Sequence, residues 1–284
     1  MNRNPRILPW AGAAAFAWIA GAGAAAATEP CGDFGECKVL IEINASDGDI
    51  GFHFLMDGDD LKTSSIIDPK GRTVFVDKAK GPLKDQTLTE TFAESAEPVC
   101  RKELAEDEDD VVLTLKKFIK RWKAGTYKFR GKDIEGEKAR GSSPLTHDIP
   151  AAPADVDFDV DTGVISWSDT GDDLGECATN EELDTFVADG VLPTHPEDVV
   201  VREYEAVFEP DVEDGDPTGN LGFSVRVPPD QLSVTVPAEL LAALPADTPA
   251  KVEVGAIGLE DNATFSEEDE FCINEDAGCG FEEE

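Results

Sequence analysis

The chain has 284 residues, of which 61 are Asp or Glu and 24 are Lys or Arg, so its formal charge at neutral pH is −37. A surface this negative repels phosphate backbones and anionic lipids, which excludes nucleic acid and acidic membrane surfaces as expected partners. Because 40% of the residues are hydrophobic, the chain can still bury apolar cores, and global disorder is not expected.

The first 27 residues have the pattern of a secretory signal. Arg3 and Arg6 precede an apolar run from Ile7 to about Ala27, which ends in three alanines of the kind that signal peptidase cleaves. A permanent membrane anchor is the alternative, but the run is short and rich in alanine and glycine, which suits it poorly to spanning a bilayer. We expect a mature chain that begins near Thr28, keeps no stable membrane anchor and is secreted or periplasmic.

Six cysteines follow this predicted cleavage site, and in an oxidising compartment cysteines form disulfides by default. Their spacing favours two local pairs, Cys31–Cys37 and Cys272–Cys279, which leaves Cys100 and Cys177 for each other, although sequence alone does not choose among the pairings. A zinc–thiolate site would need a Cys-x-x-Cys pair or a Cys/His cluster, and neither occurs. The candidate disulfide residues are Cys31, Cys37, Cys100, Cys177, Cys272 and Cys279.

The charge is unevenly distributed. Residues 151–284 contain 36 acidic and three basic residues, whereas residues 116–140 contain ten basic and three acidic ones. The basic stretch is a solvated face, a surface that docks on the acidic second half, or a site for an external anion such as a polysaccharide. Among the two binding hypotheses we favour docking, because the acidic half is already tethered at high effective concentration.

Alternating apolar residues predict β-structure for most of residues 28–150. Residues 38–44 and 50–56 form one predicted hairpin, and residues 66–76 form a second with its turn at Pro-Lys-Gly. Thr87–Glu97 is interpreted as a short helix, since Leu88 and Phe92 are four apart, and residues 115–122 also have helical spacing. Thr126–Arg130 alternates as a strand. We expect a jelly-roll-like or immunoglobulin-like β-sandwich.

A proline-rich segment, residues 142–154, is the predicted boundary to a second domain. Seven short alternating strands follow, interrupted by a long acidic insert at 169–198, and this pattern predicts an immunoglobulin-like sandwich. The predicted organisation of this all-β chain is therefore a signal peptide (1–27), an N-terminal sandwich (28–150), a second sandwich (151–273) and an acidic cysteine-bearing tail (274–284).

Several residues of the second predicted domain stand where one known family has its characteristic positions. They are the proline-rich entry at 150–153, Trp167, Tyr204, and Thr248 ahead of an alternating strand. In these residues the segment 151–273 resembles a fibronectin type III domain. That family usually has a tyrosine two residues after the threonine, where this chain has Ala250, so the corner must be held by other contacts. The resemblance implies a fold and says little about function, because such domains serve as spacers, binding modules and adhesive units.

No catalytic residues are predicted. His53 lies in a predicted strand between Phe52 and Phe54 and is interpreted as a packed or surface imidazole, while His147 and His195 lie near the boundary and in the insert. Nucleophile-elbow, phosphate-loop and dinucleotide motifs do not occur in the sequence. We therefore expect a noncatalytic binding or structural protein whose partner is an unknown protein or glycan at the cell exterior. An extracellular hydrolase with an unrecognised site is the second alternative.

Calcium or cation binding is the first alternative. Acids occupy every second position from Asp155 to Asp161, and acidic loops occur at residues 47–49 and 211–216. Carboxylate oxygens are calcium ligands, but none of these segments matches the helix–loop–helix calcium pattern. Calcium is accordingly a possible ligand, and no other cofactor is expected.

Overall fold

The structure is a computed structural model that describes residues 31–105, 111–212 and 215–279. Strands dominate it, which confirms the all-β fold class. The predicted signal peptide and the last five residues of the acidic tail lie outside the described residues. Within the described part, every helix is too short or too polar to cross a membrane.

The strands of the N-terminal half are β1 (Glu36–Asn44), β2 (Asp49–Ile67), β3 (Thr73–Lys78), β4 (Leu88–Glu94), β5 (Gly125–Asp133) and β6 (Lys138–Leu145). Its helices are α1 (Leu83–Gln86) and α2 (Leu115–Arg121), with a 3-10 turn at Lys102–Leu104. The second half contains β7 (Ala154–Asp159), β8 (Val164–Ser168), β9 (Val201–Pro210), β10 (Phe223–Val227), β11 (Ser233–Thr235), β12 (Thr248–Gly258) and β13 (Ala263–Ile273). It also contains α3 (Asn180–Ala188), α4 (Ala238–Leu241) and 3-10 turns at Gly175–Cys177, Pro196–Asp198 and Pro217–Asn220.

The long strand β2 organises the N-terminal half. Its first part pairs with β1 and β4 on opposite edges, and its second part pairs with β5 and β3. The predicted hairpins β1–β2 and β2–β3 are confirmed. The inward positions of β2, among them Ile50, Phe52 and Met56, are buried in the core that its alternating sequence predicts.

The prediction of a helix at Thr87–Glu97 is wrong, since this segment is strand β4. Leu88 pairs with Leu61 and Ala93 with Phe54, so β4 continues along the edge of β2 where β3 ends. An apolar pair four residues apart also fits the period of two of a strand, and pairing with the free edge decides the outcome. The predicted helix at 115–122 is confirmed as α2, with Leu115, Phe118 and Ile119 buried.

All N-terminal strands belong to one curled sheet, and the segment before β1 closes it. The N–H of Asp33 donates to the carbonyl of Arg140 in β6 at 2.9 Å, and the N–H of Arg140 donates to the Asp33 carboxylate at 2.9 Å. The next residue, Phe34, is buried against Phe129, with ring centroids 6.4 Å apart. The sandwich predicted here is therefore built by a single sheet that wraps around its core.

The second half is a β-sandwich of two sheets. Three strands in the order β11-β8-β7 pack against four in the order β10-β9-β12-β13, with a separate hydrophobic core between them. In that core Trp167 from β8 contacts Tyr204 from β9, with ring centroids 5.5 Å apart. At the end of the second half, the side-chain amide of Asn274 donates to the carbonyls of Leu241 and Leu244 at 2.9 Å each.

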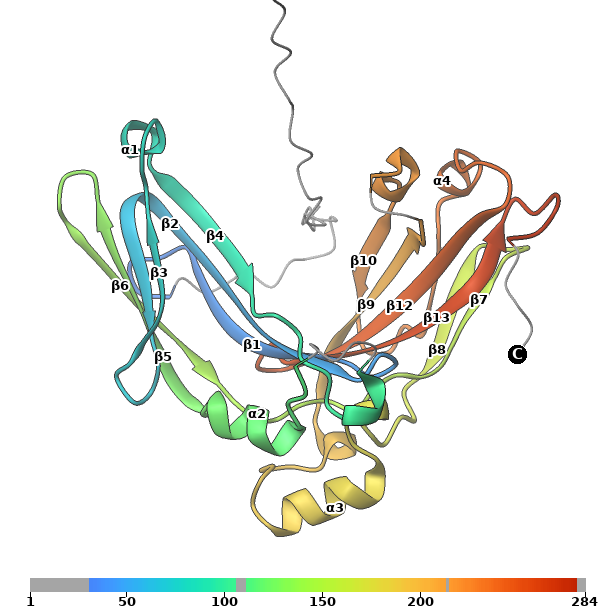
Figure 1. The fold of residues 1–284 in the computed structure, drawn as a ribbon, viewed down its shortest axis with the longest axis horizontal. Coiled ribbons are helices and arrows are strands. Elements are labelled where there is room, and N and C mark those ends of the chain that lie inside the picture. The colour runs from blue at the N-terminus through green and yellow to red at the C-terminus, as the bar shows by residue number, and fades with distance from the viewer. Residues whose placement is uncertain (1–30, 106–110, 213–214, 280–284) are drawn as a thin grey trace, which may run out of the picture.

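The two halves share one sheet. β1 from the N-terminal half pairs in parallel with β13 from the end of the second half, so ten strands form a continuous, strongly bent sheet (Figure 1). The predicted boundary at 142–154 begins inside β6, which runs to Leu145. Each half has its own hydrophobic core, but the backbone hydrogen bonds of the sheet run from one half into the other between β1 and β13. The division into two domains stays a prediction.

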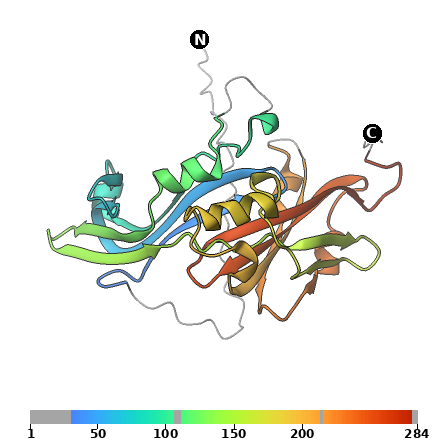
Figure 2. The ribbon, with the colours of Figure 1, turned by 90° about the horizontal axis from the view of Figure 1, so that it is seen from below.

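The acidic insert 169–198 packs on the other half of the molecule. Its Leu174, Cys177, Leu183 and Leu192 are buried in the N-terminal core, and α3 lies beside α2 under the bend of the sheet (Figures 1 and 2). Thr179 caps α3 with Glu182 in a capping box. The long acidic insert therefore holds the two halves together, and we call residues 169–198 the clasp.

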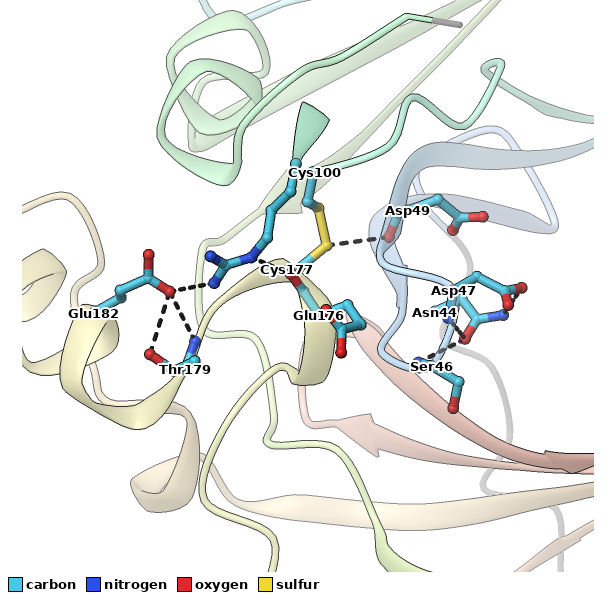
Figure 3. The surroundings of a disulfide bond; sticks show 10 residues. Asn44, Ser46, Asp47, Asp49, Cys100, Glu176, Cys177, Thr179 and Glu182 are labelled. Carbon is cyan, nitrogen blue, oxygen red and sulfur yellow. Dashed lines mark hydrogen bonds and ion pairs between the residues drawn. A yellow bond between two sulfur atoms is a disulfide. The ribbon is translucent and has the colours of Figure 1, made fainter. Parts of the chain in front are cut away.

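The structure contains three disulfides, Cys31–Cys37, Cys100–Cys177 and Cys272–Cys279, the pairs that spacing favoured. Cys100–Cys177 joins the N-terminal half to the insert (Figure 3). Beside it, Arg101 pairs with Glu182 and donates from Nε to the carbonyl of Glu176 at 2.5 Å. The disulfide, the ion pair and the buried apolar side chains therefore all attach the clasp to the N-terminal half.

Candidate functional site

The side of the continuous sheet that faces away from both cores carries a group of carboxylates. Val252 and Val254 of β12 are buried in the second core, so Lys251 and Glu253 between them point to the opposite side. The same alternation places Glu42 of β1 opposite the buried Ile41 and Ile43. We call the following carboxylates the acidic face: Glu42 of β1, Asp47 in the β1–β2 turn, Asp49 at the start of β2, Glu97 three residues after β4, Glu205 and Glu209 of β9, Glu253 of β12 and Glu267 of β13.

One lysine lies among the carboxylates at the second-half end of the acidic face. Lys251 Nζ is 2.7 Å from Glu253 Oε1, 3.3 Å from Glu209 Oε1 and 3.6 Å from Glu267 Oε2. Burial opposes its charge, but the three glutamates outweigh burial and raise the pKa of Lys251. Lys251 thus serves three acids, and Arg226 of β10 pairs with Glu205, with Nη2 2.8 Å from Oε2, so carboxylates still outnumber cations in this part of the face.

Several members of the acidic face are hard to ionise. Burial, with added repulsion from Glu97 and Asp47, raises the pKa of Asp49 to about 7. Burial and the carboxylate of Asp47 likewise raise the pKa of Glu267 to about 7. Carboxyl groups with such pKa values gain from any cation that binds beside them, because the added positive charge favours their ionised form.

At the N-terminal end of the face, His53 lies between two glutamates. It is 5% exposed, with Nδ1 3.8 Å from Glu42 Oε2 and Nε2 3.4 Å from Glu97 Oε1. Burial raises the pKa of Glu42 to about 7 although His53 acts in the opposite direction. Burial lowers the pKa of His53, but Glu97 and Glu42 more than reverse this effect, so that the pKa is raised.

Three elements bring this cluster together. Glu42 comes from β1, His53 from β2, and Glu97 from the segment after β4. On β2, Gly51 precedes His53 by two residues and shares its side of the sheet, and a Cβ there would lie 2.6 Å from His53 Nε2 and 3.0 Å from Glu97 Oε1. A glycine at this position therefore keeps the space beside the imidazole open.

The sequence left His53 as either a packed or a surface imidazole and missed Glu42 and Glu97 as its neighbours. His53 is buried, and its ring meets carboxylates on the outer side of the sheet. Alternation could have placed Glu42 and His53 on the same side, whereas Glu97 depends on the misassigned strand β4. Among the described residues, Glu42, His53 and Glu97 are the group whose potential metal-ligand atoms converge, all within 4.8 Å of one another.

The other histidines make structural contacts. His147 Nε2 lies 2.8 Å from the carbonyl of Trp122, and burial lowers the pKa of this side chain. His195 Nδ1 accepts a hydrogen bond from the N–H of Glu197 at 3.4 Å, at the start of a 3-10 turn. Each of these contacts fixes a loop near the junction of the halves.

The acids proposed for calcium are spread along an exposed edge. Asp155, Asp157 and Asp159 are exposed on β7, and Asp159 Oδ1 accepts hydrogen bonds from the N–H groups of Asp161 and Thr162 in the following turn. Asp216 similarly accepts from the N–H of Thr218. The rest of the 211–216 loop falls partly outside the described residues. These oxygens cap local turns, and calcium binding there stays a prediction.

The basic stretch 116–140 contributes one described ion pair to the second half. Lys116 Nζ is 3.5 Å from the Asp189 carboxylate, and both side chains are more than half exposed. An exposed pair of this kind contributes little to stability. The contacts that join the halves come instead from the insert, from β1–β13 and from Cys100–Cys177, so docking by the basic stretch stays a hypothesis.

Comparison with known proteins does not place the chain in a family. No family model matches it, and no curated protein matches it. Among solved structures, one similarity is to a chain described as a biofilm associated protein, BSP domain, with 10% sequence identity and a TM-score of 0.23. The alignment covers 87% of this chain and 30% of that chain. A TM-score this low supports no conclusion about fold or function.

Proposed function

We propose that this protein is an exported, noncatalytic binding or structural protein whose acidic face binds a positively charged surface of another protein. The single observation that carries the proposal is the group of carboxylates on the shared sheet, three of which, Glu42, Asp49 and Glu267, have pKa values raised to about 7, chiefly by burial. Ligand cations would relieve the repulsion among these carboxylates on contact.

Export is supported by the predicted signal peptide and by the three disulfides, which are stable in oxidising compartments. A scaffold role is supported by the clasp and by the shared sheet, which hold the acidic face across both halves. A pocket of about 250 Å³ between residues 45–46, 152–154 and 170–175 is lined mainly by small residues.

We also propose that residues 151–273 form a fibronectin type III-like module. Seven strands divided three and four, with the fourth strand β10 beside β9, support the resemblance seen in the sequence. The buried contact between Trp167 and Tyr204 supports it further. The insert that forms the clasp is the main departure.

The binding proposal is tested with a fluorescent oligolysine peptide at low and at physiological salt. Glu205→Gln combined with Glu209→Gln removes two charges from the acidic face, and Asp155→Asn combined with Asp157→Asn removes two from the exposed edge strand β7. We expect the first pair to weaken peptide binding several-fold and the second to change it little. Equal losses from both pairs would mean that net charge alone attracts the peptide, and would refute a binding face.

A further inference from the structure

The ring nitrogen Nε2 of His53 lies beside Glu97 but makes no hydrogen bond of normal geometry. The side chain is 5% exposed, and Nε2 is buried without a hydrogen-bond partner. A buried imidazole nitrogen in this state is costly, because burial removes water without supplying a replacement bond. The nearest polar atom is offered by Glu97, whose Oε1 lies 3.4 Å away.

The distance between His53 Nε2 and Glu97 Oε1 equals the distance expected between two ligands of one zinc ion. A zinc ion holds nitrogen and oxygen ligands at about 2.0–2.2 Å in a tetrahedron, so two of its ligands lie roughly 3.4 Å apart. His53 Nε2 and Glu97 Oε1 have this separation without a hydrogen bond between them. The space beside both atoms is kept by Gly51, since any Cβ at that position would fill it.

Glu42 completes the arrangement on the other side of the ring. Its carboxylate is 3.8 Å from His53 Nδ1, and its ligand atom lies within 4.8 Å of those of the other two residues. Metal-binding histidines commonly donate the second ring N–H to a carboxylate, which fixes the tautomer and leaves the other nitrogen for the ion. Glu42 stands where such an orienting carboxylate belongs.

We propose that His53 Nε2 and Glu97, oriented and supported by Glu42, bind a divalent transition-metal ion such as Zn²⁺. An imidazole with carboxylates suits zinc and its neighbours in the first transition row, whereas calcium takes oxygen ligands alone. Water molecules supply the remaining ligands, because Glu97 is partly exposed. The site lies at the N-terminal end of the acidic face and shares Glu42 and Glu97 with it, but an ion held there needs no second macromolecule.

Carboxylates surround the imidazole on three sides. The groups that face the imidazole are Glu42 on β1, Glu94 on β4 and Glu97 after β4, all of which favour a cation.

The test uses the oxidised chain titrated with Co²⁺, whose visible absorption reports its ligands, followed by displacement with Zn²⁺. Glu97→Gln is the main variant, because Glu97 lies after a strand and its loss does not disturb the core. Glu90→Gln is the matched control, since Glu90 is an exposed glutamate of β4 that pairs with Asp57, away from His53, and its change removes the same charge. His53→Gln is compared after circular dichroism shows that it is folded.

We expect saturation at one equivalent for the wild type, a loss of about tenfold or more in affinity for Glu97→Gln, and little change for Glu90→Gln. Excess Ca²⁺ should not displace the bound ion. The proposal is overturned if the wild type shows no saturable binding, if Glu97→Gln binds like the wild type, or if both glutamate variants weaken binding equally. In the first two outcomes the cluster shares protons only, and the oligolysine experiment is unaffected by that result.

Discussion

The side-chain Oδ1 of Asn262 accepts a hydrogen bond from the backbone N–H of Ile41 at 2.9 Å, across 221 residues of sequence. The amide nitrogen of the same side chain donates to the carbonyl and the hydroxyl of Thr146 and to the carbonyl of Asp148, at 3.0–3.3 Å. Asn262 is 0% exposed. One amide in the β12–β13 turn thus satisfies backbone groups of β1 and of the segment between the halves.

Replacing Asn262 with alanine should therefore destabilise the whole molecule. The change leaves a buried N–H and at least one buried carbonyl without partners, and each such group costs about 1–3 kcal/mol. We expect urea denaturation to show a loss of about 3 kcal/mol in the free energy of unfolding. Asn220→Ala is the control, because the Asn220 amide makes an exposed contact and its loss should change little. Equal effects would contradict the role of Asn262.

The disulfide Cys100–Cys177 should contribute more stability than either local disulfide. It closes a loop between residues 77 apart, whereas Cys31 and Cys37 are six apart. Loop-closure entropy gives about 4 kcal/mol for the longer loop and roughly 2 kcal/mol for the shorter one. We expect Cys100→Ser with Cys177→Ser to lower the melting temperature more than Cys31→Ser with Cys37→Ser. The reverse order would show that the clasp is held by its apolar contacts.

Stability should fall as the pH rises from about 5 to 8. In the unfolded chain Glu42, Asp49 and Glu267 ionise near their ordinary pKa values of 4.5, 3.8 and 4.5, whereas in the fold their pKa values are about 7. Between these limits the folded state holds protons that the unfolded state has released, so the free energy of unfolding decreases with pH. The raised pKa of His53 acts in the same direction, because its contribution is complete below about 6.5 and is lost above.

Thermal melts in chelator at these pH values measure the effect. Glu42→Gln mimics the protonated side chain, so it should flatten the slope and raise the melting temperature at pH 8. A melting temperature that increases from pH 5 to pH 8 in the wild type would contradict the raised pKa values.

Removing the anchor of the clasp should loosen the insert. Leu183 of α3 is 0% exposed within the N-terminal core, and a buried leucine changed to alanine costs about 2–5 kcal/mol. The insert contains glutamates but no lysine or arginine, so a glutamate-specific protease is the suitable probe. We expect Leu183→Ala to be cut in the insert much faster than the wild type. Leu259→Ala, at a side chain 60% exposed, should be cut like the wild type.

The sequence predicted what depends on local periodicity. Alternation identified β1, β2 and the strands of the second sandwich, and the buried positions Tyr204, Ala206 and Phe208 are confirmed. It failed at Thr87–Glu97, where two apolar residues fit either period and a free strand edge decided the structure. Local patterns do not encode such distant pairing.

The same limit explains why the site was missed. Glu42, His53 and Glu97 converge only when β1, β2 and the end of β4 lie side by side, and their separation in sequence hides that arrangement. The insert was recognised by its length and acidity, but its apolar residues, among them Leu174, Leu183 and Leu192, were not assigned to a core in the other half. Because the insert is rich in acidic residues, its sequence did not indicate that one side of it is buried.

The parallel pairing of β1 with β13 has a consequence for the order of events during synthesis. β1 can pair with β2 early, but it gains its second neighbour, β13, only after residue 263 has been made, and the N-terminal core receives Leu174, Leu183 and Leu192 only after the insert arrives. Until then β1 presents an unpaired edge that can associate with other chains. Folding should therefore be slow, because these contacts join residues far apart in sequence, and the incomplete chain should be prone to association.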